Sequence, residues 1–140
     1  MSVGIVIVTH GDTGQSLLDD AEFILGQSLA DIRFIPFRQS RAHTTGNLEV
    51  RQTIEENDSG QGVLILTDLI GASPSNLVKS LLNEHHAMMV TGVNLAMLIR
   101  VWNYRDAELE SLTHKAVQGG RLTSVPTGID GGSDKLTQVD

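Results

Sequence analysis

The sequence predicts an α/β fold, an open parallel sheet of four strands with helices on both faces. Two short, continuous apolar runs, Val3–Val8 and Gly62–Thr67, are typical of strands that are buried on both faces. Segments with apolar residues at helical spacing alternate with these runs and with further short apolar runs. Such alternation implies parallel pairing through right-handed crossovers that place helices over the sheet.

Each element is predicted from its own local signals. The four strands are expected at Val3–Val8, Ile32–Phe37, Gly62–Thr67 and Ala87–Val90. The five helices are expected at Gln15–Leu25, Asn47–Glu56, Ser73–Leu82, Asn94–Tyr104 and Asp106–Gln118. Ser73 and Pro74 have the residue types of an N-cap and a first helical position. The pair Gly119-Gly120 is expected to stop the last helix, and Leu122–Val125 is expected to form a short final strand.

The order of the strands predicts where a site would lie. Pro36 assigns Ile32–Phe37 to an edge, and the two most apolar strands belong in the centre, which gives the order 2-1-3-4. The chain then leaves the first strand in one direction and later returns on its other side. The crevice between the carboxyl ends of strands 1 and 3 is therefore the switch point, where ligands bind in open α/β sheets. His10 and Asp68 stand at those two ends.

Composition narrows the class of protein. The 140 residues suit one domain, expected at 1–126 and followed by a flexible tail at 127–140. A net charge of −7 disfavours nucleic-acid binding, and the absence of cysteine excludes disulfides and thiolate chemistry. The apolar runs are far shorter than the ~20 residues of a membrane helix, and there is no signal-peptide pattern. We therefore expect a cytoplasmic protein without membrane insertion.

A histidine beside a carboxylate suits phosphoryl transfer. If Asp68 accepts a hydrogen bond from Nδ1 of His10, the Nε2 lone pair is free to attack. The small residues, hydroxyls and helix start in 71–76 suit a phosphate, and Gly11 would let the backbone approach it. The alternatives are a hydrogen-bonded loop histidine, an aspartate that only forms a turn, and a tight turn that opens a helix.

Other kinds of site have no support in the sequence. No His, Asp or Glu cluster has metal-ligand spacing, and there is no Walker loop or G-x-G-x-x-G, so neither a metal nor a cofactor is expected. His85 and His86 are expected at the surface.

Three segments resemble the IIA domain of the mannose-type (mannose/fructose/sorbose) phosphoenolpyruvate-dependent sugar phosphotransferase system. They are Gly4–Gly11, Gly62–Asn76 and Thr91–Leu98, of which the middle one is the most specific. Their order and spacing extend the resemblance from residue 3 to about residue 125. The segment Arg100–Arg105 is similar to stand-alone proteobacterial members.

The resemblance implies a phosphohistidine at His10, oriented by Asp68, with a phosphate-binding loop at Gly71, Ala72 and Ser73. The phosphoryl group would come from the carrier protein HPr and pass to a separate IIB protein, since no IIB segment follows. Family members are also homodimers that exchange a C-terminal strand, here near Leu122–Val125.

Three positions depart from the family pattern. Ala72 replaces a second glycine and Ala96 replaces a proline. The loop Arg38–His43 is basic where many relatives are acidic, which bears on the choice of partner.

Two other functions stay open at this point. One is a regulatory module whose phosphorylation state is read by a partner without sugar transport. The other is the phosphodonor subunit of a dihydroxyacetone kinase. The sequence does not identify the sugar or the acceptor.

Overall fold

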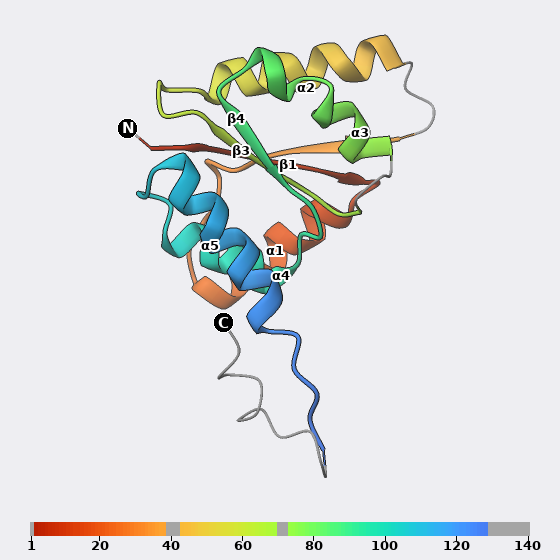
Figure 1. The fold of residues 1–140 in the computed structure, drawn as a ribbon. Coiled ribbons are helices and arrows are strands. Elements are labelled where there is room, and N and C mark those ends of the chain that lie inside the picture. Colours follow the sequence, from red (N-terminus) through yellow and green to blue (C-terminus); the bar gives the residue numbers. More distant parts are fainter. Residues whose placement is uncertain (1, 39–42, 70–72, 129–140) are drawn as a thin grey trace.

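The computed structural model describes residues 2–38, 43–69 and 73–128 (Figure 1). Within these ranges the strands are β1 (Gly4–His10), β2 (Arg33–Phe37), β3 (Val63–Thr67) and β4 (Ala87–Val90). The helices are α1 (Thr13–Leu25), α2 (His43–Asn57), α3 (Ser73–Lys79), the short 3-10 turn η1 (Leu82–Glu84), α4 (Leu95–Asn103) and α5 (Leu109–Leu122). The α/β class is confirmed.

The strands form one parallel sheet in the order β2-β1-β3-β4, which confirms the predicted order. The proline-bearing β2 lies at an edge, where the missing N–H of Pro36 leaves no gap in an interior ladder. β1 and β3 lie side by side in the centre, with Val6 opposite Ile65 and Val8 opposite Thr67. The carboxyl ends of β1 and β3 are therefore neighbours.

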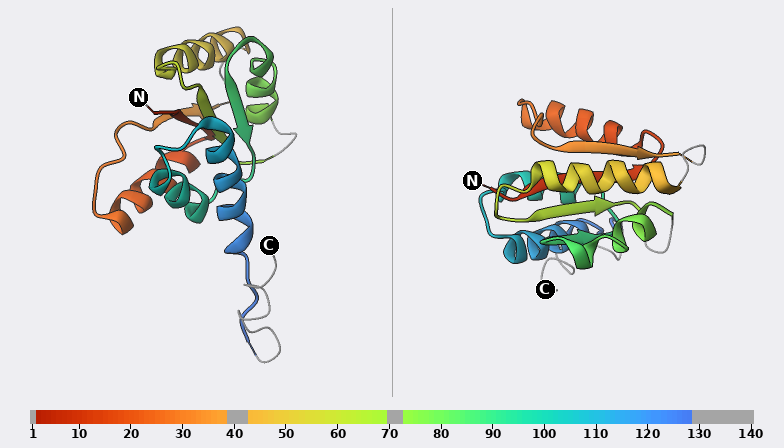
Figure 2. Two further views of the ribbon diagram at one scale, coloured as in Figure 1. Left: turned by 60° about the vertical axis from the view of Figure 1, so that its left-hand side comes forward. Right: turned by 90° about the horizontal axis from the view of Figure 1, so that it is seen from above.

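Helices cover both faces of the sheet, with α2 and α3 on one side and α1, α4 and α5 on the other (Figures 1 and 2). Alternate residues of β1 serve the two faces: Ile5 and Ile7 pack in the core under α1, α4 and α5, and Val6 and Val8 pack in the core under α2 and α3. Because helices cover both faces of the sheet, the central strands are apolar throughout and do not alternate between apolar and polar residues.

The predicted stop of the last helix at Gly119-Gly120 is wrong, because α5 continues to Leu122. Gly119 is buried against α4, where a Cβ would lie 3.0 Å from Arg100 Cδ and 3.2 Å from Met97 Cα. The glycine thus permits close packing of two helices instead of ending one. Leu122 consequently belongs to α5, and the described residues 123–128 form no strand within this chain.

Other helix boundaries also differ from those predicted. α2 begins at His43, four residues before the predicted start. α3 ends at Lys79, and the chain then tightens into η1, so the predicted single helix to Leu82 is divided.

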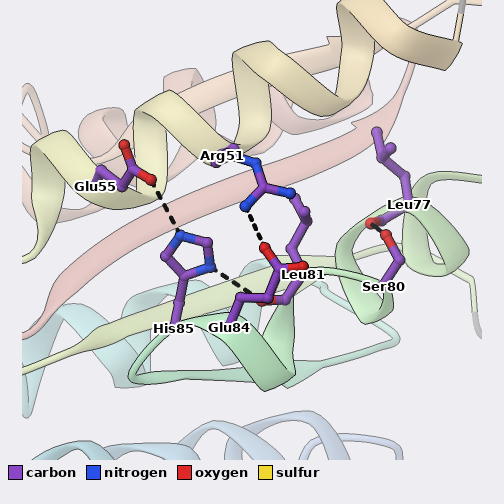
Figure 3. A network of polar contacts seen from close by, with 7 residues as sticks. All are labelled: Arg51, Glu55, Leu77, Ser80, Leu81, Glu84 and His85. Atoms are coloured by element: carbon purple, nitrogen blue, oxygen red, sulfur yellow. Dashed lines mark hydrogen bonds and ion pairs between the residues drawn. The ribbon is translucent and has the colours of Figure 1, made fainter.

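The expectation that His85 lies at the surface is wrong. Its side chain is only 12% exposed, with Nδ1 3.0 Å from the Leu81 carbonyl oxygen and Nε2 3.3 Å from Glu55 Oε1 (Figure 3). Arg51 of α2 pairs with Glu84 of η1 in the same network. These polar contacts tie α2 to the segment before β4. His86 is exposed, as expected.

Exchange of a C-terminal strand between two copies remains a prediction. Leu122 and Val125 are 44% and 37% exposed, and β4 forms an edge of the sheet in the single chain. An edge strand with free backbone groups is a ready partner for an added strand. Most of the predicted tail, 129–140, lies outside the described residues.

We expect the full chain to sediment as a dimer at micromolar concentration, because pairing would bury Leu122 and Val125. Truncation after Pro126 should leave the dimer intact, whereas truncation after Thr123, which keeps α5 whole, should weaken it. Sedimentation of the three chains, with circular dichroism as the folding control, tests this. A full-length monomer would rule out the exchange.

Candidate functional site

His10 and Asp68 contact each other where the two central strands end. His10 is the last residue of β1, and Asp68 directly follows β3. His10 Nδ1 lies 2.8 Å from Asp68 Oδ2, and the backbone N–H of His10 donates to the same oxygen at 3.1 Å. Because a carboxylate only accepts, Nδ1 carries the proton, and in the neutral ring Nε2 then presents its lone pair. The histidine side chain is 47% exposed, so this lone pair belongs to an accessible ring.

Both the carboxylate and the backbone carbonyl of Asp68 accept hydrogen bonds. Its Oδ1 accepts from the Leu69 N–H at 3.0 Å, and its carbonyl accepts from the Gly92 N–H at 2.7 Å. Burial by itself raises the pKa of Asp68, but hydrogen bonds from the His10 side chain, the His10 N–H and the Leu69 N–H outweigh burial. The pKa of Asp68 therefore lies below its ordinary value of 3.8, and the group is ionised at neutral pH.

Thr9, which sequence reasoning did not single out, fixes the start of α1 beside the histidine. Its buried Oγ1 accepts from the Gly14 N–H at 2.8 Å. A usual cap bonds two or three residues ahead, and here the spacing is five, so the ordinary capping signal is absent. Gly14 allows this approach, since a Cβ there would lie 2.6 Å from Phe34 Cε1. The N-terminus of α1, with its positive dipole end, is thereby kept three residues from His10.

The predicted phosphate-binding residues are only partly described. Gly11 adjoins His10 with φ +46°, and a Cβ added there would meet no atom within 4 Å. Its N–H donates to the Phe37 carbonyl at 3.0 Å, so Gly11 offers open space and not a free donor. Gly71 and Ala72 lie outside the described residues. Ser73 is the first residue of α3, and its side chain is likewise not described.

The end of β2 adds two side chains to this edge of the sheet. Phe37 is in register with His10, and their rings meet edge to face with centroids 6.4 Å apart. Arg38 Nη2 lies 2.7 Å from Asp12 Oδ1. The sequence marks the basic loop but gives no sign that Arg38 pairs with an acid two residues after the histidine.

In the part of the chain that the structure describes, no three His, Cys, Asp or Glu side chains gather closely enough to hold a metal ion. Among the same residues, no helix has the length and apolar character needed to span a membrane.

Comparison with protein families identifies the chain. The family model described as "PTS system fructose IIA component" matches residues 4–117. The chain belongs to the fructose/mannose IIA family of the phosphotransferase system.

Individual relatives agree with this assignment. The IIA chain is 32% identical over 124 residues to the PTS system mannose-specific EIIAB component of Escherichia coli strain K12, with 86% of this chain and 38% of that protein covered. It thus spans little more than a third of that relative. It is 28% identical over 105 residues to the PTS system fructose-specific EIIA component of Bacillus subtilis, covering 74% of this chain and 71% of that protein.

A solved structure shows the same fold. The mannose/sorbose specific IIA subunit of the phosphotransferase system from Enterococcus faecalis superimposes with a TM-score of 0.81 at 21% identity. The match covers 92% of this chain and 97% of that one.

The contact between His10 and Asp68 of this IIA protein predicts a pH response. Because the His10 side chain helps to lower the pKa of Asp68, His10→Ala should raise that pKa. A group with a lowered pKa stabilises the fold above its unfolded pKa and loses this effect as the pH falls through the folded value. The stability difference between wild type and Asp68→Asn should accordingly shrink below about pH 4.

Carbon-13 NMR titration of the carboxyl groups measures these values. Asp58 is the matched control, because hydrogen bonds from the Gly60 and Gly62 N–H groups lower its pKa at a different place. An unchanged pKa of Asp68 in His10→Ala would contradict the prediction.

Proposed function

We propose that this IIA protein is a phosphocarrier in which His10 accepts a phosphoryl group and passes it on. The observation that carries the proposal is the 2.8 Å contact of His10 Nδ1 with Asp68, which selects the neutral tautomer whose Nε2 lone pair is free on a half-exposed ring. A nucleophilic histidine needs its tautomer fixed in this way, and Asp68 is ionised to do so.

The transfer balances without an additional proton. The Nε2 lone pair of His10 attacks phosphorus, the N–P bond of a phosphohistidine donor breaks, and its electron pair returns to the donor ring as neutral imidazole. The ring of His10 becomes an imidazolium that bears the phosphoryl group. Asp68 stabilises that positive charge through the Nδ1–H hydrogen bond, as a carboxylate does for an imidazolium in hydrolases.

The surroundings suit the phosphoryl oxygens. The start of α1 at Thr13 places the positive end of a 13-residue helix close to His10. Gly11 provides room, and Gly71, Ala72 and Ser73 are proposed as the phosphate-binding turn because they follow Asp68 in the sequence and lead into α3, which begins at Ser73. Electrostatic stabilisation by such groups supplies much of the catalysis in phosphoryl transfer.

The donor is proposed to be HPr and the acceptor a separate IIB protein. Membership of the IIA family supports both roles, and the E. coli relative combines A and B components in its name. Transfer between proteins also requires an accessible histidine, which the exposure of His10 provides.

We expect His10 to be the phosphorylated residue. Incubation with phosphoenolpyruvate, enzyme I and HPr should give an acid-labile label that maps to His10 and disappears in His10→Ala. His86→Ala, which removes an exposed histidine elsewhere, should keep the label. Undiminished labelling of His10→Ala would refute the proposal.

Asp68→Asn should fold normally and slow transfer by about ten- to ten-thousandfold. The amide can donate to Nδ1 and favour the unreactive tautomer, and it removes the charge that stabilises the imidazolium. Rapid-quench measurement of transfer from phosphorylated HPr gives the rate, with Asp58→Asn as the control that should match wild type. A wild-type rate in Asp68→Asn would show that Asp68 has no role in the transfer and serves only to form a turn.

A further inference from the structure

Arg38 and Asp12 form an ion pair at the same edge of the sheet as His10. Arg38 follows β2, whose last residue, Phe37, is in register with His10. The Gly11 N–H donates to the Phe37 carbonyl, which binds the chain after β1 to the end of β2. Arg38 Nη2 then reaches Asp12 Oδ1 at 2.7 Å.

The pair is too exposed to be needed for the fold. The side chains of Arg38 and Asp12 are 49% and 72% exposed, and exposed ion pairs contribute about 0–1 kcal/mol to stability. Asp12 sits at the N-cap position of α1, yet its side chain makes no capping hydrogen bond. Thr9 satisfies the Gly14 N–H instead. The carboxylate of Asp12 is therefore directed to Arg38 and not to the helix.

The backbone positions that carry both charges lie near the histidine, since Asp12 is two residues after His10 and Arg38 follows its register partner Phe37. Two residues of chain span at most about 7 Å, so the backbone of Asp12 lies within roughly one physiological screening length of His10. A phosphoryl group on His10 would carry close to two negative charges and three acceptor oxygens. A guanidinium binds such a group through two parallel hydrogen bonds and more strongly than it binds one exposed carboxylate oxygen.

We propose that Arg38 is a phosphoryl-binding residue that Asp12 holds while His10 is unmodified. When His10 carries the phosphoryl group, the guanidinium exchanges Asp12 for the phosphoryl oxygens, and no covalent bond changes in this step. Arg38 then favours the phosphorylated state and Asp12 opposes it, so the pair sets how readily the group is retained. This inference rests on the proposed phosphorylation of His10.

The test compares Arg38→Gln, Asp12→Asn and the double variant. His10 is phosphorylated chemically with phosphoramidate and, separately, by phosphorylated HPr. Phosphorus-31 NMR follows the titration of the phosphoryl group, and the distribution of label between HPr and this protein gives the equilibrium. The matched control is Arg33→Gln, which removes the exposed arginine at the opposite end of β2.

Arg38→Gln should raise the second pKa of the phosphoryl group and move the equilibrium toward HPr by up to about fivefold, as expected for an exposed charge interaction. Asp12→Asn should lower the second pKa of the phosphoryl group and move the equilibrium away from HPr. Arg33→Gln should change neither the pKa nor the equilibrium. Arg38→Lys keeps the charge but loses the two parallel hydrogen bonds of the guanidinium, so its pKa and equilibrium should lie between those of wild type and Arg38→Gln. It also replaces Arg38→Gln if that variant does not fold.

The outcomes separate the two proposals. If wild type is labelled and Arg38→Gln behaves like Arg33→Gln, the role of Arg38 is overturned and the phosphocarrier stands. The same holds if Asp12→Asn moves the readouts in the same direction as Arg38→Gln. If HPr fails to label wild type but phosphoramidate modifies His10, the carrier role fails, and the phosphorus-31 titration still decides the role of Arg38. If neither reagent modifies His10, both proposals fall.

Discussion

The hydrogen bond between His10 Nδ1 and Asp68 is the interaction on which the arrangement of the site depends. It joins residues 58 positions apart in the sequence, and it exists because β1 and β3 are parallel neighbours whose carboxyl ends coincide. A shift of one residue in the pairing would turn one of the two side chains to the other face of the sheet. Both faces of these strands pack against helices, so such a shift would force both cores to repack, and packing of the core therefore determines the geometry of the site.

That core has two parts, and each part restrains a different side of the histidine. The cluster that contains Ile7 holds α1, whose start is pinned by Thr9, while the cluster that contains Val8 holds α2. The polar network of Arg51, Glu55, Glu84 and His85 adds a tie between α2 and the chain before β4 (Figure 3). β1 is therefore packed against helices on both faces, and His10 is the last residue of a well-packed strand. Such support is what an oriented nucleophile requires.

Local patterns were sufficient to predict the sheet and its central pair of side chains, because strand order and strand ends follow from apolar runs and Pro36. The local patterns failed where a contact with a distant segment decides the role of a residue. Gly119 resembles a helix stop, yet its lack of a Cβ allows α5 to approach Met97 and Arg100. His85 follows a helix in a polar sequence, but its side chain is mostly buried and contacts Glu55, 30 residues away, whose own side chain is exposed. The ion pair of Arg38 and Asp12 depends likewise on β2 lying beside β1. Contacts between segments decide these cases, and no local signal encodes them.

In the proposed carrier, the charges at the carboxyl edge of the sheet together determine how strongly the phosphoryl group is bound. The chain has a net charge of −7, so a phosphoryl group is added against an unfavourable overall field. The positive end of α1 and the guanidinium of Arg38 offset that field locally, whereas Asp68 acts on the ring and Asp12 competes for the guanidinium. A carrier must release what it accepts. A cation with an alternative partner stabilises the phosphoryl group less than an unpaired cation would, because breaking its contact with Asp12 lowers the net gain. In the proposed carrier, a moderate affinity for the phosphoryl group would thus follow from the same two residues that the end of β2 and the start of α1 bring together.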